Sequence, residues 1–155
     1  MAGVSTASFR GALRAPIAGG RPSRLAVRAA SGSGEWQKVC TRKELSEGGG
    51  RVRAKVGGEK VFVQEFEGQL YCLSNVCTHL SLPLVGRTPI LQGQIVEGCM
   101  ECPLHKTRFD LKTGEVKGEW APTFPEIPFV GKGDPKPLPT FSVRENEDGT
   151  IEALI

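Results

Sequence analysis

The stretch ECPLHKTRFD, residues 101–110, holds one of only two histidines in this chain of 155 residues. The other histidine lies in VCTHL, residues 76–80. Each histidine follows a cysteine by two or three positions, in the patterns C-x-H and C-x-x-H. A thiolate and an imidazole are both metal ligands, so two such loops face to face would supply two sulfurs and two nitrogens. We therefore expect one metal centre, with the ligands Cys77, His79, Cys102 and His105.

The order of the ligands distinguishes two kinds of centre. Zinc fingers usually group like ligands, as C-x₂₋₄-C and H-x₃₋₅-H, whereas each loop here is mixed. A mixed loop suits a [2Fe–2S] centre in which two cysteines bind one iron and two histidines bind the other, because each loop then reaches both irons. A structural zinc site is the alternative, since Cys99 forms a C-x₂-C spacing with Cys102 ahead of His105.

Together with their flanks, the two motifs resemble the Rieske [2Fe–2S] family over residues 35–155. The segment GQLYCLSNVCTHL (68–80) is similar to the hairpin that enters the family's first cluster loop. RFDLKTGEV (108–116) is similar to the strand and turn after the second loop, and LPTFSVRENEDGTIEAL (138–154) to the final hairpin. The resemblance implies a small antiparallel β-sandwich or barrel. It also implies a cluster at the tip of two loops, with its histidine side facing solvent.

Periodicity independently predicts the all-β class. Short alternating runs separated by turn residues are typical of a sandwich or barrel. A short helix is expected after Thr41, because Glu44 three residues later completes a capping box and glycines end the run at 48–50. The expected strands are 35–40, 51–56, 59–66, 70–75, 94–99, 107–111, 140–145 and 150–155, with 94–99 and 107–111 paired around the second motif.

A proline-rich segment interrupts this pattern. Residues 119–139 carry six of the eleven prolines, so neither a helix nor a central strand is expected there. We predict an extended segment that crosses the surface. The alternative is a strip that binds a partner protein.

Departures from the Rieske pattern concern how the loops are held. The interval between His79 and Cys102 is longer than usual in the family, and we expect the insertion at 84–93. The family members of the cytochrome complexes tie their loops with a disulfide, and the matching positions here are Leu82 and Leu104. The resemblance therefore implies that packing alone holds the two loops.

Other departures concern the electronics of the centre. Thr107 stands where those members have a serine that donates a hydrogen bond to the cluster, and it retains a hydroxyl. Phe109 replaces a tyrosine donor and has none, so we expect a potential in the lower part of the Rieske range of roughly −150 to +300 mV. Lys106 stands where the family usually has glycine, a residue often needed for an unusual backbone angle.

The first 30 residues differ in composition from the rest. They contain five arginines and no acid, which is typical of a plastid transit peptide, with mitochondrial import as the alternative. Residues 31–34 are expected to form a flexible entry. The 17 acidic residues all follow, against 20 − 5 = 15 basic ones, and no basic run predicts nucleic-acid binding. No apolar stretch approaches the roughly 18 residues of a membrane-spanning helix.

These features predict a one-electron carrier rather than an enzyme. An aromatic-ring oxygenase needs a second iron site with two further histidines, and this chain has none to spare. Its partners would be a redox donor and a redox acceptor protein. The alternative is a non-catalytic protein that binds photosystem II or its antenna, because CPLHKT and the proline-rich tract weakly resemble thylakoid Rieske-type proteins linked to that complex.

Overall fold

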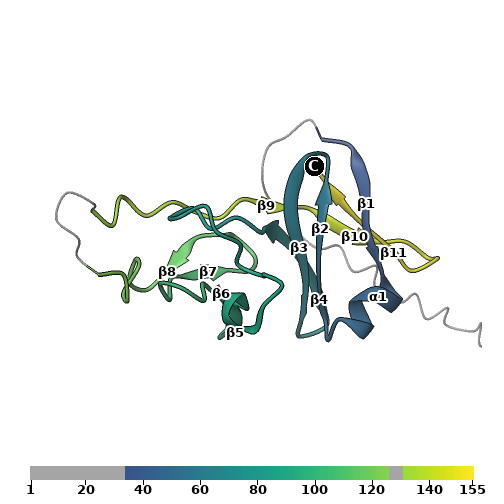
Figure 1. The fold of residues 1–155 in the computed structure, drawn as a ribbon. Helices are drawn as coiled ribbons and strands as arrows, with labels where there is room; N and C mark the ends of the chain where they lie inside the picture. Colours follow the sequence, from purple (N-terminus) through teal and green to yellow (C-terminus); the bar gives the residue numbers. More distant parts are fainter. Residues whose placement is uncertain (1–33, 126–130) are drawn as a thin grey trace, which may run out of the picture.

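The computed structural model describes residues 34–125 and 131–155, and the predicted transit peptide lies outside them. The described residues form three antiparallel sheets (Figure 1). The first contains β1 (Trp36–Thr41), β11 (Thr150–Leu154) and β10 (Val143–Glu145), in that order. The second contains β2 (Arg51–Val56), β3 (Glu59–Phe66), β4 (Gln69–Ser74) and β9 (Thr140–Phe141). The third contains β5 (Gln94–Val96), β6 (Cys99–Glu101), β7 (Arg108–Asp110) and β8 (Val116–Lys117). The all-β prediction is confirmed.

The second sheet separates two hydrophobic cores. Successive side chains of a strand point to opposite faces, and in β3 Val61 and Val63 pack into the core shared with the first sheet. Phe62, between them, packs into the other core, next to the metal-binding motifs. All three side chains are fully buried, so β3 contributes to both hydrophobic cores. The first and second sheets lie to the right in Figure 1 and the third sheet to the left.

The predicted capping box forms at the start of α1 (Arg42–Glu47). The backbone N–H of Glu44 donates to Oγ1 of Thr41 at 3.2 Å, and the N–H of Thr41 donates to Oε2 of Glu44 at 2.7 Å. Both bonds satisfy donors that the first helical turn leaves free. Leu45, fully buried, anchors the helix to the core of the first sheet.

Two predicted strands are divided in the structure. The prediction of one strand at 94–99 is wrong, because Glu97 and Gly98 have φ of 51° and 74° and form a two-residue turn between β5 and β6. Two consecutive left-handed residues are typical of a tight hairpin. Of the expected pairing with 107–111, the part formed by β6 and β7 is present, and β5 pairs with β6 instead. The predicted strand 140–145 also divides, since β9 pairs with β4 and β10 with β11.

The two remaining irregular regions lie beside the motifs. The predicted insertion contains a short 3₁₀ turn, η1 (Pro89–Leu91). The described parts of the proline-rich segment, 119–125 and 131–139, contain no helix or strand, as predicted. No helix in the described part of the chain is long and apolar enough to cross a membrane.

Candidate metal centre

The first motif lies on a tight loop that follows β4. The backbone N–H of Ser81 donates to the carbonyl of Cys77 at 2.9 Å, and the N–H of Cys77 donates to the carbonyl of Leu82 at 2.8 Å. Ser81 has a left-handed φ of 56°. Both the N–H and the carbonyl of Cys77 are thus bonded to the far end of the loop, and His79 lies between these two ends.

The second motif repeats this backbone pattern between β6 and β7. The N–H of Lys106 donates to the carbonyl of Cys102 at 3.1 Å, and the N–H of Cys102 donates to the carbonyl of Thr107 at 2.8 Å. Lys106 has a φ of 61°, so it is the counterpart of Ser81. The glycine usual here would adopt this angle without strain. The two loops therefore have equivalent backbones. They differ in the position of the histidine, which follows the cysteine by two residues in the first loop and by three in the second.

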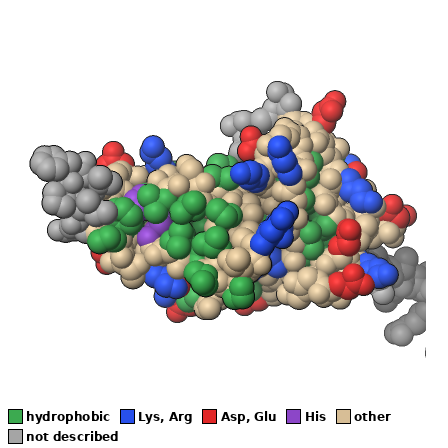
Figure 2. Space-filling model, in the orientation of Figure 1, with side chains coloured by type: hydrophobic (Ala, Val, Ile, Leu, Met, Phe, Trp, Pro, Cys, Tyr) green, Lys and Arg blue, Asp and Glu red, His purple; other side chains and the backbone are tan. Residues whose placement is uncertain are grey.

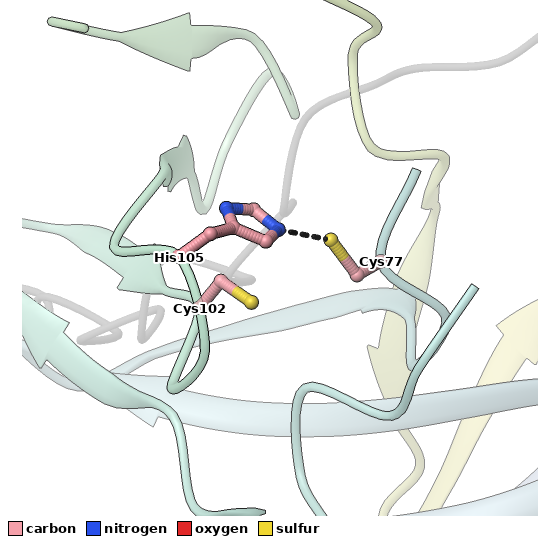
Figure 3. Close-up of side chains that lie close together, drawn as sticks. All are labelled: Cys77, Cys102 and His105. Atoms are coloured by element: carbon pink, nitrogen blue, oxygen red, sulfur yellow. Dashed lines mark hydrogen bonds between the residues drawn. The ribbon is translucent and has the colours of Figure 1, made fainter. Parts of the chain in front are cut away.

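The two loops bring their ligand atoms together. Sγ of Cys77, Sγ of Cys102 and one ring nitrogen of His105 all lie within 4.8 Å of one another. Figure 3 shows Cys102 and His105 on one loop facing Cys77 on the other, with 2.9 Å between the Cys77 Sγ and Nε2 of His105. The ring of His79 lies beside them, with its centroid 4.6 Å from that of His105. Three of the four predicted ligands thus present converging atoms, and His79, although outside this group, lies next to it.

The electrostatics of the centre favour one thiolate and one neutral imidazole. A hydrogen bond with Cys77 lowers the pKa of Cys102 well below its ordinary value, and the same bond, with burial, raises the pKa of Cys77. The pair therefore favours one thiolate without any metal. Burial, followed by the nearby His105, lowers the pKa of His79, which favours the neutral imidazole that binds metals.

A buried polar atom at the centre lacks a partner. Nδ1 of His79 is buried and has no hydrogen bond to any described residue. An unsatisfied buried nitrogen is rare in folded proteins, and a metal is one of the groups that can satisfy it. Two sulfurs and two imidazoles, one of which has this open nitrogen, together fit the donor set of a cluster with two cysteine and two histidine ligands.

The proline-rich segment covers the histidines, and this corrects one prediction. The expectation that both histidines face solvent is wrong for His105, which is 1% exposed. Trp120 lies over both rings, 6.1 Å from His105 and 5.3 Å from His79 between centroids, and Phe124 lies edge-on to His79 at 4.6 Å. The cause is tertiary, since the segment after β8 folds back over the loops. His79, only partly buried, is the more accessible of the two.

Hydrogen bonds hold this cover in position. The indole Nε1 of Trp120 donates to the carbonyl of Lys132 at 2.9 Å, joining the two described arms of the segment. The hydroxyl of Thr78, inside the first loop, donates to the carbonyl of Lys136 at 2.9 Å. In Figure 1 the two arms extend together to the left of the third sheet.

Thr107 and Phe109 lie directly under the cover. Oγ1 of Thr107 accepts the backbone N–H of Ala121 at 2.8 Å and lies 2.8 Å from Nδ1 of His105. Its hydroxyl therefore positions the histidine. Phe109 is fully buried and packs edge-on against Trp120 at 6.4 Å between centroids, so an aromatic contact replaces a hydroxyl donor.

The side chain of Lys106 forms an ion pair. Its Nζ lies 3.3 Å from Oε1 of Glu101, an ion pair that offsets its charge near the centre. Glu101 also pairs with Nε of Arg108 at 3.3 Å.

The two leucines at the disulfide positions are exposed. Leu82 and Leu104 are 41% and 38% exposed, with Leu80 nearby at 40%. Figure 2 shows hydrophobic side chains gathered around the histidines on this face.

Every cysteine is free in the structure, so hydrogen bonds and packing hold the loops. Asn75 supplies a buried clamp, because its side-chain amide bonds both the N–H and the carbonyl of Val85, at 2.7 and 2.9 Å.

Cys99 does not join the centre. It is absent from the group of converging ligands among the described residues, and its Sγ lies 3.8 Å from the carbonyl of Glu97. Cys40 and Cys72 pack in the other core, as expected for small apolar residues.

Comparison with known proteins agrees with this geometry. The model of the family described as "Rieske [2Fe-2S] domain" matches residues 35–141. This chain belongs to the Rieske family. A Rieske-type [2Fe–2S] cluster follows as its cofactor, and the zinc alternative is set aside.

Several relatives of this Rieske chain are ferredoxin components. It is 37% identical over 81 residues to the ferredoxin component of naphthalene 1,2-dioxygenase/salicylate 5-hydroxylase systems from Ralstonia sp., covering 52% of this chain and 71% of that protein. Sulredoxin from Sulfurisphaera tokodaii is 29% identical over 122 residues, with 76% and 95% covered. The ferredoxin of carbazole 1,9a-dioxygenase from Nocardioides aromaticivorans has a similar solved structure, with a TM-score of 0.55, 25% identity, and 77% and 96% covered.

Several residues that build this Rieske site could not be predicted from the sequence. Trp120 and Phe124 were part of the proline-rich segment, whose path over the histidines depends on tertiary contacts. Asn75 stood only as a polar residue at the end of a strand. A buried asparagine just before a ligand loop is the one pattern that could have suggested its role, because such a residue needs backbone partners.

Proposed function

We propose that this protein carries single electrons between a donor and an acceptor protein. Cys77 and Cys102 would bind one iron of its Rieske cluster, and His79 and His105 the other. The observation that carries this proposal is the convergence of two equivalent loops, each offering one sulfur and one imidazole, with Nδ1 of His79 buried and unpartnered. When bound, the cluster supplies reversible one-electron reduction and oxidation.

The residues around the centre have separate tasks in this proposal. Thr107 and Trp120 hold His105 away from water, which makes its environment less polar. His79, the less buried histidine, lies nearest the surface. The exposed leucines Leu80, Leu82 and Leu104 surround this region and would form the contact for a redox partner.

The relatives support a carrier that serves a larger redox system. Those from Ralstonia and Nocardioides are named as ferredoxins of dioxygenase systems. We infer that the acceptor of this chain is another metalloprotein, of which an oxygenase component is one chemical class. The chain offers no histidines beyond the proposed ligands for a second iron site of its own.

Spectroscopy of ligand variants tests the proposal. The full chain, reconstituted with iron and sulfide and then reduced, should give the low-average-g EPR signal of a cluster with mixed ligands. Cys77→Ser, His79→Ala and His105→Ala should each abolish that signal. Cys99→Ser is the matched control, because it removes a buried thiol outside the centre, and it should keep the signal. A colourless protein with stoichiometric zinc, or a ligand variant with an unchanged spectrum, would contradict the assignment.

We also propose that the protein acts in the plastid. The acid-free, arginine-containing residues 1–30 support import as a transit peptide. A fluorescent fusion should follow plastids and lose this distribution when residues 1–30 are deleted. A mitochondrial distribution of the intact fusion would overturn the assignment.

Association with photosystem II or its antenna is the second candidate role. The observation that favours it is the exposed leucine surface beside the histidines, which a partner complex could cover. Fractionation of thylakoids separates the two roles. A wholly stromal protein argues for the free carrier, and co-migration with photosystem II argues for the associated form.

A further inference from the structure

A groove lined by arginines lies between the edge strand β2 and the loop 84–93. Its volume is about 540 Å³, and no acidic residue lines it. Its polar lining comes from Arg51, Arg53, Arg87, Gln64 and Gln92. It is separate from the metal centre, although Val85 is shared between its lining and the core that contains Cys77.

The register of β2 explains why two of the arginines face this groove. Arg51 pairs with Gln64 and Arg53 with Phe62, and paired residues of antiparallel strands share one face of a sheet. Phe62 faces the core beside the cluster loops, so both arginines extend on that side of the sheet. Among the described residues no further strand continues the sheet beyond the edge of β2, and Arg87 approaches from the loop opposite.

These three arginines differ from every other arginine in the described part of the chain. Arg42, Arg108 and Arg144 each form an ion pair with a carboxylate. The groove arginines form none with any residue that the structure describes. The three unpaired guanidinium groups of residues 34–125 and 131–155 are thus gathered around one cavity.

Arg51 shows most clearly that a counter-charge is missing. Its Nε donates to Oε1 of Gln64 and its Nη1 to the carbonyl of Gly93, both at 2.6 Å, and both acceptors are neutral. Burial lowers the pKa of Arg51, with no carboxylate to offset it. A partly buried cation without a counter-charge is unfavourable, so an anion in the groove would stabilise it.

We propose that this groove binds a small molecule that carries phosphate groups. A guanidinium presents a planar fork of donors that matches the oxygens of phosphate or carboxylate. A phosphate group carries about −1.5 to −2 charges, more than one carboxylate, and so suits three adjacent cations better. The groove falls within the roughly 300–1,000 Å³ of small-molecule sites, which leaves room for more than one charged group. General attraction of anions is not the cause, because residues 34–155 carry 17 acidic and 15 basic side chains.

Calorimetry of the cluster-loaded full chain tests this site. Inorganic pyrophosphate, titrated at low ionic strength, should bind saturably at one site and more tightly than citrate, which represents carboxylate anions. Arg53→Gln and Arg87→Gln should each weaken pyrophosphate binding about fivefold to tenfold, since each removes a charge-assisted contact. Lys112→Gln is the matched control, an exposed lysine outside the groove with the same change in charge, and should bind within about twofold of the unchanged protein.

Each outcome has a defined meaning. Absence of saturable pyrophosphate binding, or an equal loss in Lys112→Gln, overturns the site. Tighter binding of citrate overturns the phosphate assignment and identifies a carboxylate ligand. The EPR signal of the cluster should be unchanged in Arg53→Gln and Arg87→Gln, which shows that these variants are folded and that the groove acts independently of the electron-transfer site. Loss of that signal in both variants would show that the arginines are structural and would also overturn the proposal.

Discussion

Replacement of Asn75 by alanine tests how the metal loops are held together. Asn75 is 7% exposed, and among the described residues its side chain is the only hydrogen-bond partner of both backbone groups of Val85. Asn75→Ala leaves a buried N–H and a buried carbonyl without partners. Each unsatisfied group costs about 1–3 kcal/mol, so the free energy of unfolding should fall by about 2–6 kcal/mol. That is a large part of the roughly 5–15 kcal/mol of a typical domain.

Urea unfolding measures this loss. Tryptophan fluorescence reports on both halves, because Trp36 lies on β1 and Trp120 over the metal centre. With a denaturant slope of about 1–3 kcal/mol per molar, the midpoint should fall by at least about 0.7 M. The rate of cluster loss at a fixed urea concentration should rise as well, because Asn75 lies two residues before Cys77.

Gln92→Ala is the matched control for this clamp. The amide Nε2 of Gln92 donates one bond to the carbonyl of Gly86 at 2.7 Å, and its side chain is exposed. Only one acceptor, the carbonyl of Gly86, loses its partner, so the loss should be about half of that in Asn75→Ala or less. If Asn75→Ala costs no more than Gln92→Ala, the clamp does not hold the loops and the reasoning is wrong.

Three further perturbations test other parts of the structure. Gly114→Ala should prevent stable folding or lower the urea midpoint strongly, because φ is 75° and the new Cβ would stand 1.9 Å from the carbonyl oxygen of Leu138. Lys106→Gly should raise the free energy of unfolding by about 0.5–1 kcal/mol, since glycine adopts the left-handed φ without strain. Burial raises the pKa of Cys40 from 9.0 to about 11 and that of Cys72 to about 12. The unfolded thiols ionise first, so between pH 9 and 11 the free energy of unfolding should fall with a slope of up to about 1.4 kcal/mol per pH unit for each thiol.

Each of these has its own control. Gly118→Ala meets no atom within 4 Å at a similar φ of 78°, so it should cost only the backbone strain and far less than Gly114→Ala. Lys106→Ala removes the charge but keeps the strained angle, and an equal gain there would assign the effect to charge. Stability that is unchanged between pH 9 and 11, or the same slope in Cys72→Ala, would contradict the thiol argument.

Features carried by neighbouring residues could be predicted from the sequence. The capping box at Thr41 depends on contacts three residues apart, and β2 and β3 follow from alternation and a glycine turn. The four expected ligands stand out because the chain has two histidines and each follows a cysteine. Local chemistry of this kind leaves few alternatives, because the interacting groups are joined by a short stretch of chain.

Errors arose where a local pattern competes with a distant partner. The run 94–99 reads as one strand, yet the turn at Glu97 divides it so that β6 can lie between β5 and β7. The histidines were expected in solvent because the resemblance to the Rieske family implies a solvent-facing histidine side. Trp120 covers them only because the segment after β8 returns across the loops, which composition alone cannot indicate.

The sequence by itself determined the all-β class, the two mixed motifs and the lack of cysteines at the disulfide positions. The tertiary structure decided that His105 is buried while His79 stays accessible, that Asn75 clamps the loops, and that unpaired arginines surround one groove. The physical reason is the same in each case. Burial and charge pairing depend on residues brought together from distant parts of the chain, and sequence patterns register only neighbours.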